Sequence, residues 1–383
     1  MAKISDDAVI IGIGETPIGK IPGMNSQELQ ALAVVNAVKD AGLQLKDIDG
    51  LINLDPYGIP NSMFSTTVAE YLGIRPSYCT TVDVGGTVTS MTMLQHAVWA
   101  LGAGHAKNIV CVFAENAVTG RPPDAHGFYL KNQLGGEEWE EPFGVQGMVM
   151  QYALVAQRYL HDYGADISDF GAVAVAERNH ALLTDNALMK KPITLEDHRN
   201  SRMIASPLRL LDCSVPADGG GALVLTSPAN ARRLGAKAVR LRSMAMRQTH
   251  NSIAVLPDIK DFGMADAGRR AFEDAGMGPE DMQLLNLHDA FTVSATGWKP
   301  CASFAAKPAG GRVPTPGGPS SAATAACSRS AASRFWKRYD HGRDHRDSSP
   351  AHQCERPLLG RLQPRRTAAR KMQRLHPPVL LPA

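Results

Sequence analysis

Apolar and polar residues follow one another along the first 120 residues in blocks that predict alternating strands and helices. The apolar runs at residues 8–14 and 108–114 are typical of strands buried on both faces. Between them, residues 25–41 and 89–101 carry apolar side chains at helical spacing, and residues 51–54 predict a short strand. Asn25 and Glu28 stand at the spacing of a capping box at the start of the first of these helices. Strands that alternate with helices predict an α/β fold in which helices cover a sheet.

Residues 120–206 break this alternation. They mix proline, glycine, aromatic and charged residues, with helical spacing at 148–163 and 167–183 but few strand signals. This composition indicates a helical cap or loop region inserted into the α/β body. Strand character returns at residues 219–226 and 238–245.

The chain also repeats itself when it is shifted by 234 residues. Residues 37–55 then match residues 271–289, and both copies read as a helix, an Asp-Ala-Gly stop, an acidic turn and a strand. The strand of the second copy is expected at 283–287. Helix-stop chemistry is common enough to give a few such matches by chance, but the full register favours an internal duplication.

These patterns predict four parts. Residues 1–119 and 207–237 form the first half, residues 120–206 the insertion, and residues 238–296 the start of a second half. Residues 297–383 form an atypical tail with 16 Lys and Arg against 4 Asp and Glu, whereas the rest of the chain has 24 against 33. Such a basic tail could bind nucleic acid, but it lacks a recognisable module, so no nucleic-acid partner is expected.

Several classes of protein are not expected from the composition. The first residues lack the apolar segment of a signal peptide, and no run of 18 apolar residues predicts a membrane span. The six cysteines show no CxxC pairing, which favours a reduced, cytoplasmic setting and no metal site. Gly12 and Gly14 follow a strand, but Pro17 stands where a dinucleotide fingerprint needs glycine.

Four segments together resemble the thiolase superfamily. They are residues 1–114, RYLHDYGADISDFGAVAVAERNHALL at 158–183, SRMIASPLRLLDCSVPADGGGALVL at 201–225, and NLHDAFT at 286–292. The resemblance is to the branch related to sterol carrier protein X thiolase, whose bacterial members are often labelled thiolase-like or nonspecific lipid-transfer proteins. It covers about residues 1–294 and implies a duplicated αβαβα layered fold with an inserted helical cap.

The resemblance places the nucleophile segment at residues 82–90, VDVGGTVTS. The family has a cysteine near Gly86 or Thr87, and neither residue is cysteine here. Thr87 is a weak substitute, because an alcohol needs stronger activation than a thiol. The backbone amides of Gly85 and Gly86 could hold a thioester oxygen at the start of the next helix, or these glycines could form a plain tight turn.

His288, in the HDAFT motif, is the strongest catalytic candidate. The resemblance implies an oxyanion or acid/base role; alternatively His288 caps the end of the strand expected at 283–287. Asp289 is expected to cap the helix that follows. Cys213 is expected to be a small packed residue and not a replacement nucleophile. The resemblance also brings three residues of one loop near the thioester: Asp218, Gly219 and Gly220.

The resemblance implies an enzyme that forms or cleaves a carbon–carbon bond next to a coenzyme A thioester, with that thioester as substrate and no bound cofactor. Without the cysteine, a retro-aldol or lyase route is more natural than thiolysis. A thiolase or acyltransferase with an unrecognised nucleophile and a non-catalytic acyl-CoA or lipid carrier remain alternatives. The expected partners are a second copy of the chain and a small OB-fold, zinc-ribbon protein.

The tail suggests a change of reading frame. The bases of Trp298 and Lys299 contain a glutamate codon in a shifted frame, and that frame allows Leu-Glu-Ala-Leu-Arg and then Cys-Gly-Glu-Ala-Gly through residue 309. The family often has a similar helix and acidic turn about here, and its GHP-type histidine is missing from the tail. We therefore hypothesise a frameshift between Ser294 and Trp298, which would make residues 297–383 foreign to the fold.

Overall fold

The structure is a computed structural model of the whole chain. It describes residues 8–56, 61, 63–86, 88–120, 139–145, 147–250, 252–284 and 286–296. Thr87 and the basic tail at 297–383 therefore lie outside the described residues. The predicted domain boundaries stay a prediction.

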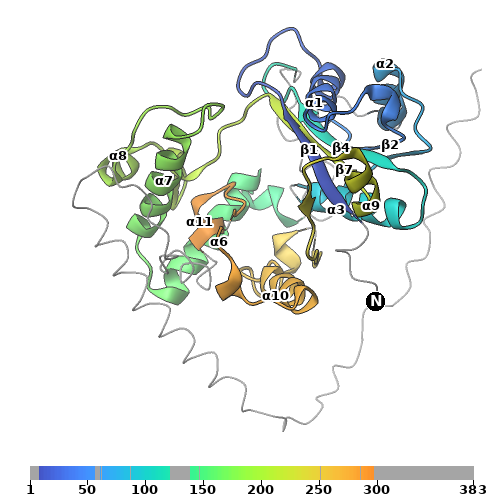
Figure 1. Cartoon of the computed structure of the whole chain (residues 1–383). Coiled ribbons are helices and arrows are strands. Elements are labelled where there is room, and N and C mark those ends of the chain that lie inside the picture. The colour runs from blue at the N-terminus through green and yellow to red at the C-terminus, as the bar shows by residue number, and fades with distance from the viewer. Residues whose placement is uncertain are drawn as a thin grey trace, which may run out of the picture. The chain divides into compact units, whose positions relative to one another are not determined.

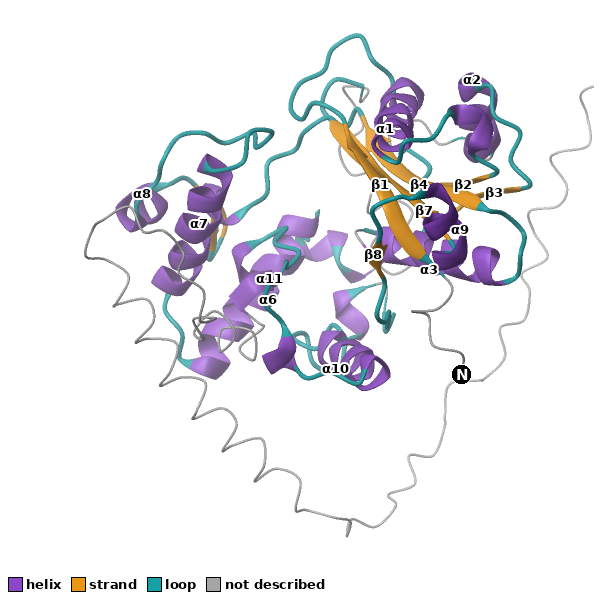
Figure 2. Cartoon of the chain, in the orientation of Figure 1, coloured by secondary structure: helices purple, strands orange, loops and turns teal. Residues whose placement is uncertain are grey.

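One six-stranded sheet forms the centre of the first half, in the order β3-β2-β4-β7-β1-β8 (Figure 2). Its strands are β1 (Val9–Glu15), β2 (Gly50–Asn53), β3 (Tyr78–Thr81), β4 (Asn108–Glu115), β7 (Gly219–Thr226) and β8 (Val239–Arg240). β2 pairs in parallel with β3 and β4, whereas β7 runs antiparallel to both β4 and β1. Because β7 lies beyond the insertion in sequence but between β4 and β1 in space, the insertion interrupts the first half, as predicted. β8 is shorter than the strand expected at 238–245.

Helices cover both faces of this sheet, as the alternating pattern predicted (Figure 1). They are α1 (Ser26–Asp40), α2 (Phe64–Leu72), α3 (Val88–Gly102) and α9 (Pro228–Leu234). α1 and α2 pack with Leu51 and Val110 on one face, and α3 packs with Ile52 and Ile109 on the other. α1 begins with the predicted capping box, in which Asn25 accepts from the Glu28 amide and Glu28 accepts from the Asn25 amide.

The insertion is helical, as expected. It contains η3 (Glu141–Phe143), α6 (Met148–Tyr163), α7 (Ile167–Leu182), α8 (Leu195–Asn200) and β5 (Met203–Ala205). Just after it, β6 (Leu208–Arg209) pairs with β5 and is followed by η4 (Leu210–Asp212). One hydrophobic cluster contains Tyr159, Phe170 and Leu208 together with Phe291 and Val293 from the start of the second half. The insertion therefore packs against the HDAFT motif. No helix in the described part of the chain is long and apolar enough to span a bilayer.

The start of the second half, residues 238–296, contains η5 (Ile253–Val255), α10 (Met264–Ala275), η6 (Pro279–Asp281) and α11 (Thr292–Thr296). The strand predicted at 283–287 is wrong, because the described residues Gln283, Leu284, Asn286 and Leu287 are loop. A strand needs a neighbour for its backbone hydrogen bonds. β2 has such neighbours in β3 and β4, and no strand among the described residues pairs with the matching segment of the second copy.

Candidate functional site

The glycine loop joins β3 to α3. Gly85 and Gly86 have φ values of 83° and 57°, a left-handed conformation that favours glycine. The Asp83 carboxylate accepts a hydrogen bond from the Gly85 amide at 2.8 Å, and the Thr89 hydroxyl accepts one from the Val84 amide at 3.2 Å. Since Asp83 already accepts from the Gly85 amide, that amide is not available to a thioester oxygen. The oxyanion role of the Gly86 amide stays a prediction. The role of Thr87 stays a prediction.

A buried polar chain holds the strands that lead into this loop. The Asn53 side chain donates to Gln30 at 3.0 Å and accepts from the Thr81 hydroxyl at 3.0 Å. Gln30 in turn donates to the Leu54 carbonyl at 3.0 Å. Gln30 and Asn53 are fully buried, so each bond is expensive to break. The chain fixes the ends of β2 and β3 relative to α1 and thereby the start of the glycine loop.

Asp218 ties three loop segments together. Its buried carboxylate accepts hydrogen bonds from the Ile21 amide at 2.8 Å, the Val118 amide at 2.7 Å, and the Thr119 amide and hydroxyl at 3.1 and 2.8 Å. Burial alone would raise the pKa of Asp218, but these donors outweigh burial and lower it. Its oxygens are therefore occupied by the protein's own amides and the Thr119 hydroxyl, and a contact of Asp218 with a thioester stays a prediction.

Gly219 and Gly220 allow the start of β7 to lie very close to its neighbours. A Cβ atom on Gly220 would lie 2.1 Å from the Phe113 carbonyl oxygen, and one on Gly219 would lie 2.6 Å from the Pro17 oxygen. Both contacts are shorter than any side chain tolerates, so the backbone requires glycine here whether or not it meets a thioester.

The segment that follows η4 pairs with the HDAFT motif. Cys213 and Phe291 form an antiparallel bridge, and the Ser214 amide donates to the Ala290 carbonyl at 2.9 Å. His288 is exposed and does not cap a strand end, because the predicted strand is absent. Asp289 does not cap α11 either, since that helix begins at Thr292.

Asp289 instead lies close enough to Glu177 of α7 to affect the pKa of that carboxyl group. Burial and the neighbouring Asp289 together raise the pKa of Glu177 to about 8. No motif in the sequence singled out Glu177. It stands on the same side of α7 as the buried residues Phe170 and Ala174, and this helical spacing was the only available signal.

A second buried group was also missed. His198 of α8 hydrogen-bonds Asp212 at 2.7 Å between Nε2 and Oδ1, and the Thr292 hydroxyl donates to the same oxygen at 2.8 Å. The side chains of His198 and Asp212 are 2% and 0% exposed. This contact links the insertion to the residue that follows Phe291, and it uses residue types without a recognisable spacing in the sequence.

The Cys213 thiol is not a reactive thiolate. Burial, with a smaller contribution from Asp212, raises its pKa to about 11, and the thiol donates weakly to the Arg209 carbonyl at 3.4 Å. Burial raises the pKa of Cys111 as well. Among the described residues there is no cluster of three metal-ligating His, Cys, Asp or Glu side chains.

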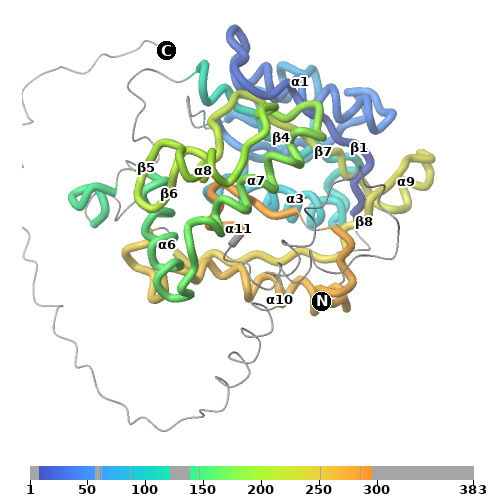
Figure 3. Tube along the Cα trace, turned by 90° about the vertical axis from the view of Figure 1, so that its left-hand side faces the viewer, coloured from blue at the N-terminus to red at the C-terminus, as the bar shows by residue number. Residues whose placement is uncertain are grey.

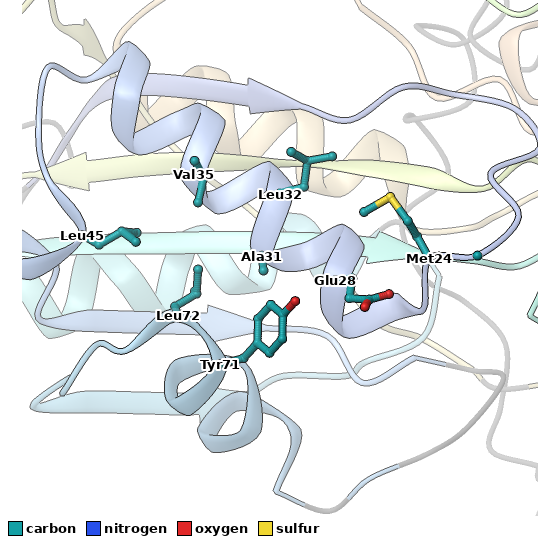
Figure 4. A pocket seen from close by; sticks show the side chains of 9 residues that line it. Met24, Glu28, Ala31, Leu32, Val35, Leu45, Tyr71 and Leu72 are labelled. Carbon is teal, nitrogen blue, oxygen red and sulfur yellow. The ribbon is translucent and has the colours of Figure 1, made fainter.

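A groove between α1 and α2 is lined by none of the site residues described above (Figure 4). It is lined by apolar side chains such as Leu32, Val35 and Leu72, with Glu28 and Tyr71 as its polar groups. Glu28 is already used in the cap of α1. The groove therefore shares no residue with the predicted site.

Comparison with known proteins supports one family. The family model described as "Thiolase C-terminal domain-like" matches residues 245–324, a range that crosses the change of composition at Gly297. The frameshift between Ser294 and Trp298 therefore stays a prediction.

Two curated relatives match most of the chain. The chain is 34% identical over 302 residues to the 17-hydroxy-3-oxo-4-pregnene-20-carboxyl-CoA lyase of Mycobacterium tuberculosis, with 76% of each protein covered. It is 33% identical over 305 residues to the steroid side-chain-cleaving aldolase of Thermomonospora curvata, again with 76% of each covered.

Solved structures support the same family and fold. The structure described as "Ltp2-ChsH2(DUF35) aldolase" is 33% identical in sequence to this chain and has a TM-score of 0.66. The match covers 76% of this chain and 75% of the chain in that structure. A monomeric SCP2-thiolase like protein from Mycobacterium smegmatis has a TM-score of 0.61 at 20% identity, which supports the fold alone. The predicted thiolase-like α/β fold is confirmed.

Proposed function

Because this chain belongs to the thiolase superfamily, we propose that it cleaves a carbon–carbon bond next to a coenzyme A thioester by a retro-aldol reaction. One observation carries this proposal. The chain lacks a cysteine at Gly86 and Thr87, and over three quarters of its length it is at least 33% identical to two proteins named as a lyase and an aldolase.

The reaction needs no protein nucleophile. A base takes the proton of a hydroxyl group on the β-carbon, the bond between the α- and β-carbons breaks, and its electron pair moves into the thioester as an enolate. An acid then returns a proton to the α-carbon, so that a β-hydroxyacyl thioester gives a ketone and a shorter acyl thioester. The Gly86 amide, at the positive end of α3, suits the enolate oxygen, and the exposed His288 suits the proton transfers.

We also propose a partner protein of the DUF35 kind, because the 33% identical structure is described as a complex with ChsH2 of that type. The OB-fold, zinc-ribbon nature of such a partner and a homodimer of this chain remain part of the proposal. A steroid side chain is the favoured acyl group, since both 76%-covered relatives carry steroid names.

The test measures cleavage of 17-hydroxy-3-oxo-4-pregnene-20-carboxyl-CoA with and without free coenzyme A. A lyase forms the ring ketone and a shorter acyl-CoA at equal rates in both reactions. Cleavage that requires free coenzyme A would indicate a thiolase, and tight binding without cleavage would indicate a carrier; either result contradicts the proposal. The reactions are run with the chain alone and with a DUF35 protein added.

A further inference from the structure

We propose that Gln248 is a positioning residue for the glycine loop, and that its side-chain amide holds the peptide group that leads to the Gly86 amide. Gln248 belongs to the start of the second half, 164 residues beyond its contact Val84 in the sequence, and no motif marks it. The contact itself depends only on the structure. Its use in catalysis rests on the retro-aldol function proposed above.

Residues 243–250 form a segment that passes between α3 and α10 (Figure 3). On the side of α10, the Ser243 hydroxyl donates to the Ala271 carbonyl at 2.7 Å, and Arg247 forms an ion pair with Asp266 at 2.8 Å. These two contacts attach the segment to the helix of the second copy.

On the side of α3, the contacts come from alternate residues of the segment. Met244 packs against the hydrophobic cluster to which α3 contributes, and the Thr92 hydroxyl of α3 donates to the Met246 sulfur at 3.1 Å. The Gln248 side chain then donates to the Val84 carbonyl at 3.1 Å. Side chains two residues apart point the same way in an extended chain, so these three contacts share one side of the segment. The two methionines on α3 therefore bring Gln248 to the glycine loop.

The peptide group between Val84 and Gly85 is held at both of its polar atoms. Gln248 donates to its carbonyl oxygen at 3.1 Å, and the Asp83 carboxylate accepts from its N–H at 2.8 Å. Because a peptide group is planar, these two contacts together fix its orientation. The residues that follow, Gly85 and Gly86, have left-handed φ values, and glycine restricts its own backbone least of all residues. Gln248 therefore restrains the direction in which the Gly86 amide points.

A buried carboxylate holds the chain just beyond this segment. The Ser252 hydroxyl donates to the Glu140 carboxylate, which also accepts from the Gln151 side chain of α6 at 2.7 Å. Glu140 and Ser252 are both buried, so their hydrogen bond is expensive to break. The chain is thus fixed on both sides of Gln248, by α10 before it and by Glu140 after it.

Ring contacts connect the same segment with the HDAFT motif. The ring centroid of His250 lies 6.1 Å from that of Phe262. The Phe262 ring lies 6.0 Å from that of Tyr152, which lies 4.5 Å from the ring of Phe291 in the motif. One segment therefore contacts both the glycine loop and the aromatic row that leads to the HDAFT motif.

The first test follows the loop without substrate. Hydrogen–deuterium exchange of residues 82–86 is measured by mass spectrometry in the full chain, for the wild type, Gln248→Met and the matched control Gln283→Met. Gln283 donates to the Asp281 carbonyl at 2.8 Å in an exposed loop, so its substitution removes a bond of the same kind elsewhere. We expect residues 82–86 to exchange about fivefold faster in Gln248→Met, with unchanged rates in the control and in β4 of every protein. Equal exchange of residues 82–86 in the wild type and Gln248→Met would overturn the proposal.

The second test measures cleavage of the thioester. A misplaced Gly86 amide weakens the bond to the enolate oxygen in the transition state more than it weakens substrate binding. Gln248→Met should therefore lower kcat by about tenfold and change KM by less than about twofold. Gln248→Lys keeps an N–H donor on a long side chain and should recover most of this loss, and Gln283→Met should keep the wild-type values. Faster exchange of residues 82–86 with an unchanged kcat would overturn the positioning role.

The outcomes also separate this proposal from the proposed function. If the wild type itself does not cleave the thioester, the retro-aldol function fails and the catalytic use of Gln248 fails with it, while the exchange of residues 82–86 still decides whether Gln248 holds the loop. Faster exchange throughout Gln248→Met, without recovery of kcat in Gln248→Lys, would indicate a general loss of structure and would overturn the positioning role.

Discussion

The two copies of the repeat share their local structure. α1 is followed by Gly42 with a φ of 69°, and α10 by Gly276 with a φ of 63°. A 3₁₀ helix comes next in each copy, at Leu45–Asp47 (η2) and Pro279–Asp281 (η6). The last aspartate of this helix accepts a hydrogen bond from the backbone amide of the residue just before the helix, Gln44 at 2.9 Å in one copy and Gly278 at 2.8 Å in the other. The same short signals therefore fold in the same way 234 residues apart.

The copies differ in what surrounds them. α1 buries eight residues against the sheet, whereas none of the residues of α10 is buried. β2 lies between two strands. Leu284, which the repeat matches to the first residue of β2, is 86% exposed in a loop. Helix ends and tight turns are thus decided by neighbouring residues in the chain, and strands and burial by partners elsewhere.

The largest effect is expected from restoring the strands with which the second copy could pair. If the reading frame changes between Ser294 and Trp298, a gene with the frame restored should encode the strands that complete the second sheet. We expect the restored protein to give a higher soluble yield and a faster turnover than the 383-residue chain, whose second sheet would keep an open edge. The measurement compares soluble yield and turnover of both proteins. Equal yields and rates would refute the frameshift, and resequencing the gene separates an error from a true lesion.

The next effect tests how the insertion holds the HDAFT motif. Asp212→Ala removes the acceptor of His198 and Thr292 and leaves His198 buried without its partner. The free energy of unfolding should fall by about 3–5 kcal/mol. Arg199→Ala breaks an exposed ion pair with Glu196 and should change it by less than about 0.5 kcal/mol. Urea titrations of both variants measure the difference, and equal losses would show that the buried contact does not hold the motif.

A matched pair of substitutions compares the two helices directly. Ala37 and Ala271 occupy the same position of the repeat. Ala37 is fully buried against β1, and the packing there is so close that a Cβ atom on Gly14 would lie 2.2 Å from the backbone nitrogen of Ala37. Ala37→Leu should overpack this contact and lower the free energy of unfolding by about 1–3 kcal/mol. Ala271→Leu should cost less than about 0.5 kcal/mol. The comparison fails if both substitutions shift the urea midpoint equally.

The smallest effect concerns pH. Glu177 has a raised pKa, so between its ordinary value of 4.5 and about 8 the folded chain holds a proton that the unfolded chain has released. Stability should therefore fall as the pH rises through this window. Glu177→Gln removes this pH dependence. Between pH 5 and pH 9, the free energy of unfolding of the variant should therefore rise by about 1–2 kcal/mol relative to that of the wild type, after allowance for partial exposure. Thermal unfolding at both pH values measures the gain, and parallel curves for the two proteins would argue against a raised pKa.

The sequence predicted most of the first half, because its elements are marked locally. The capping box at Asn25 and the apolar run of β7 gave correct boundaries to within a residue or two. The strand expected at 283–287 failed because its existence depends on neighbours that no local pattern encodes. The sequence identified the glycine loop and His288 as site candidates through their motifs. Glu177 was missed, because only the packing of α7 on the HDAFT motif brings it to Asp289.

Native-state hydrogen exchange tests most directly whether the sheet stabilises the first copy while local signals alone form the second. Exchange rates of the backbone amides are compared between α1 and α10 in the same sample. We expect the amides of α1 to exchange only when the whole fold opens, and those of α10 to exchange by local opening, at least about a hundredfold faster. Equal protection of the two helices would show that α10 has partners of its own and would contradict the account.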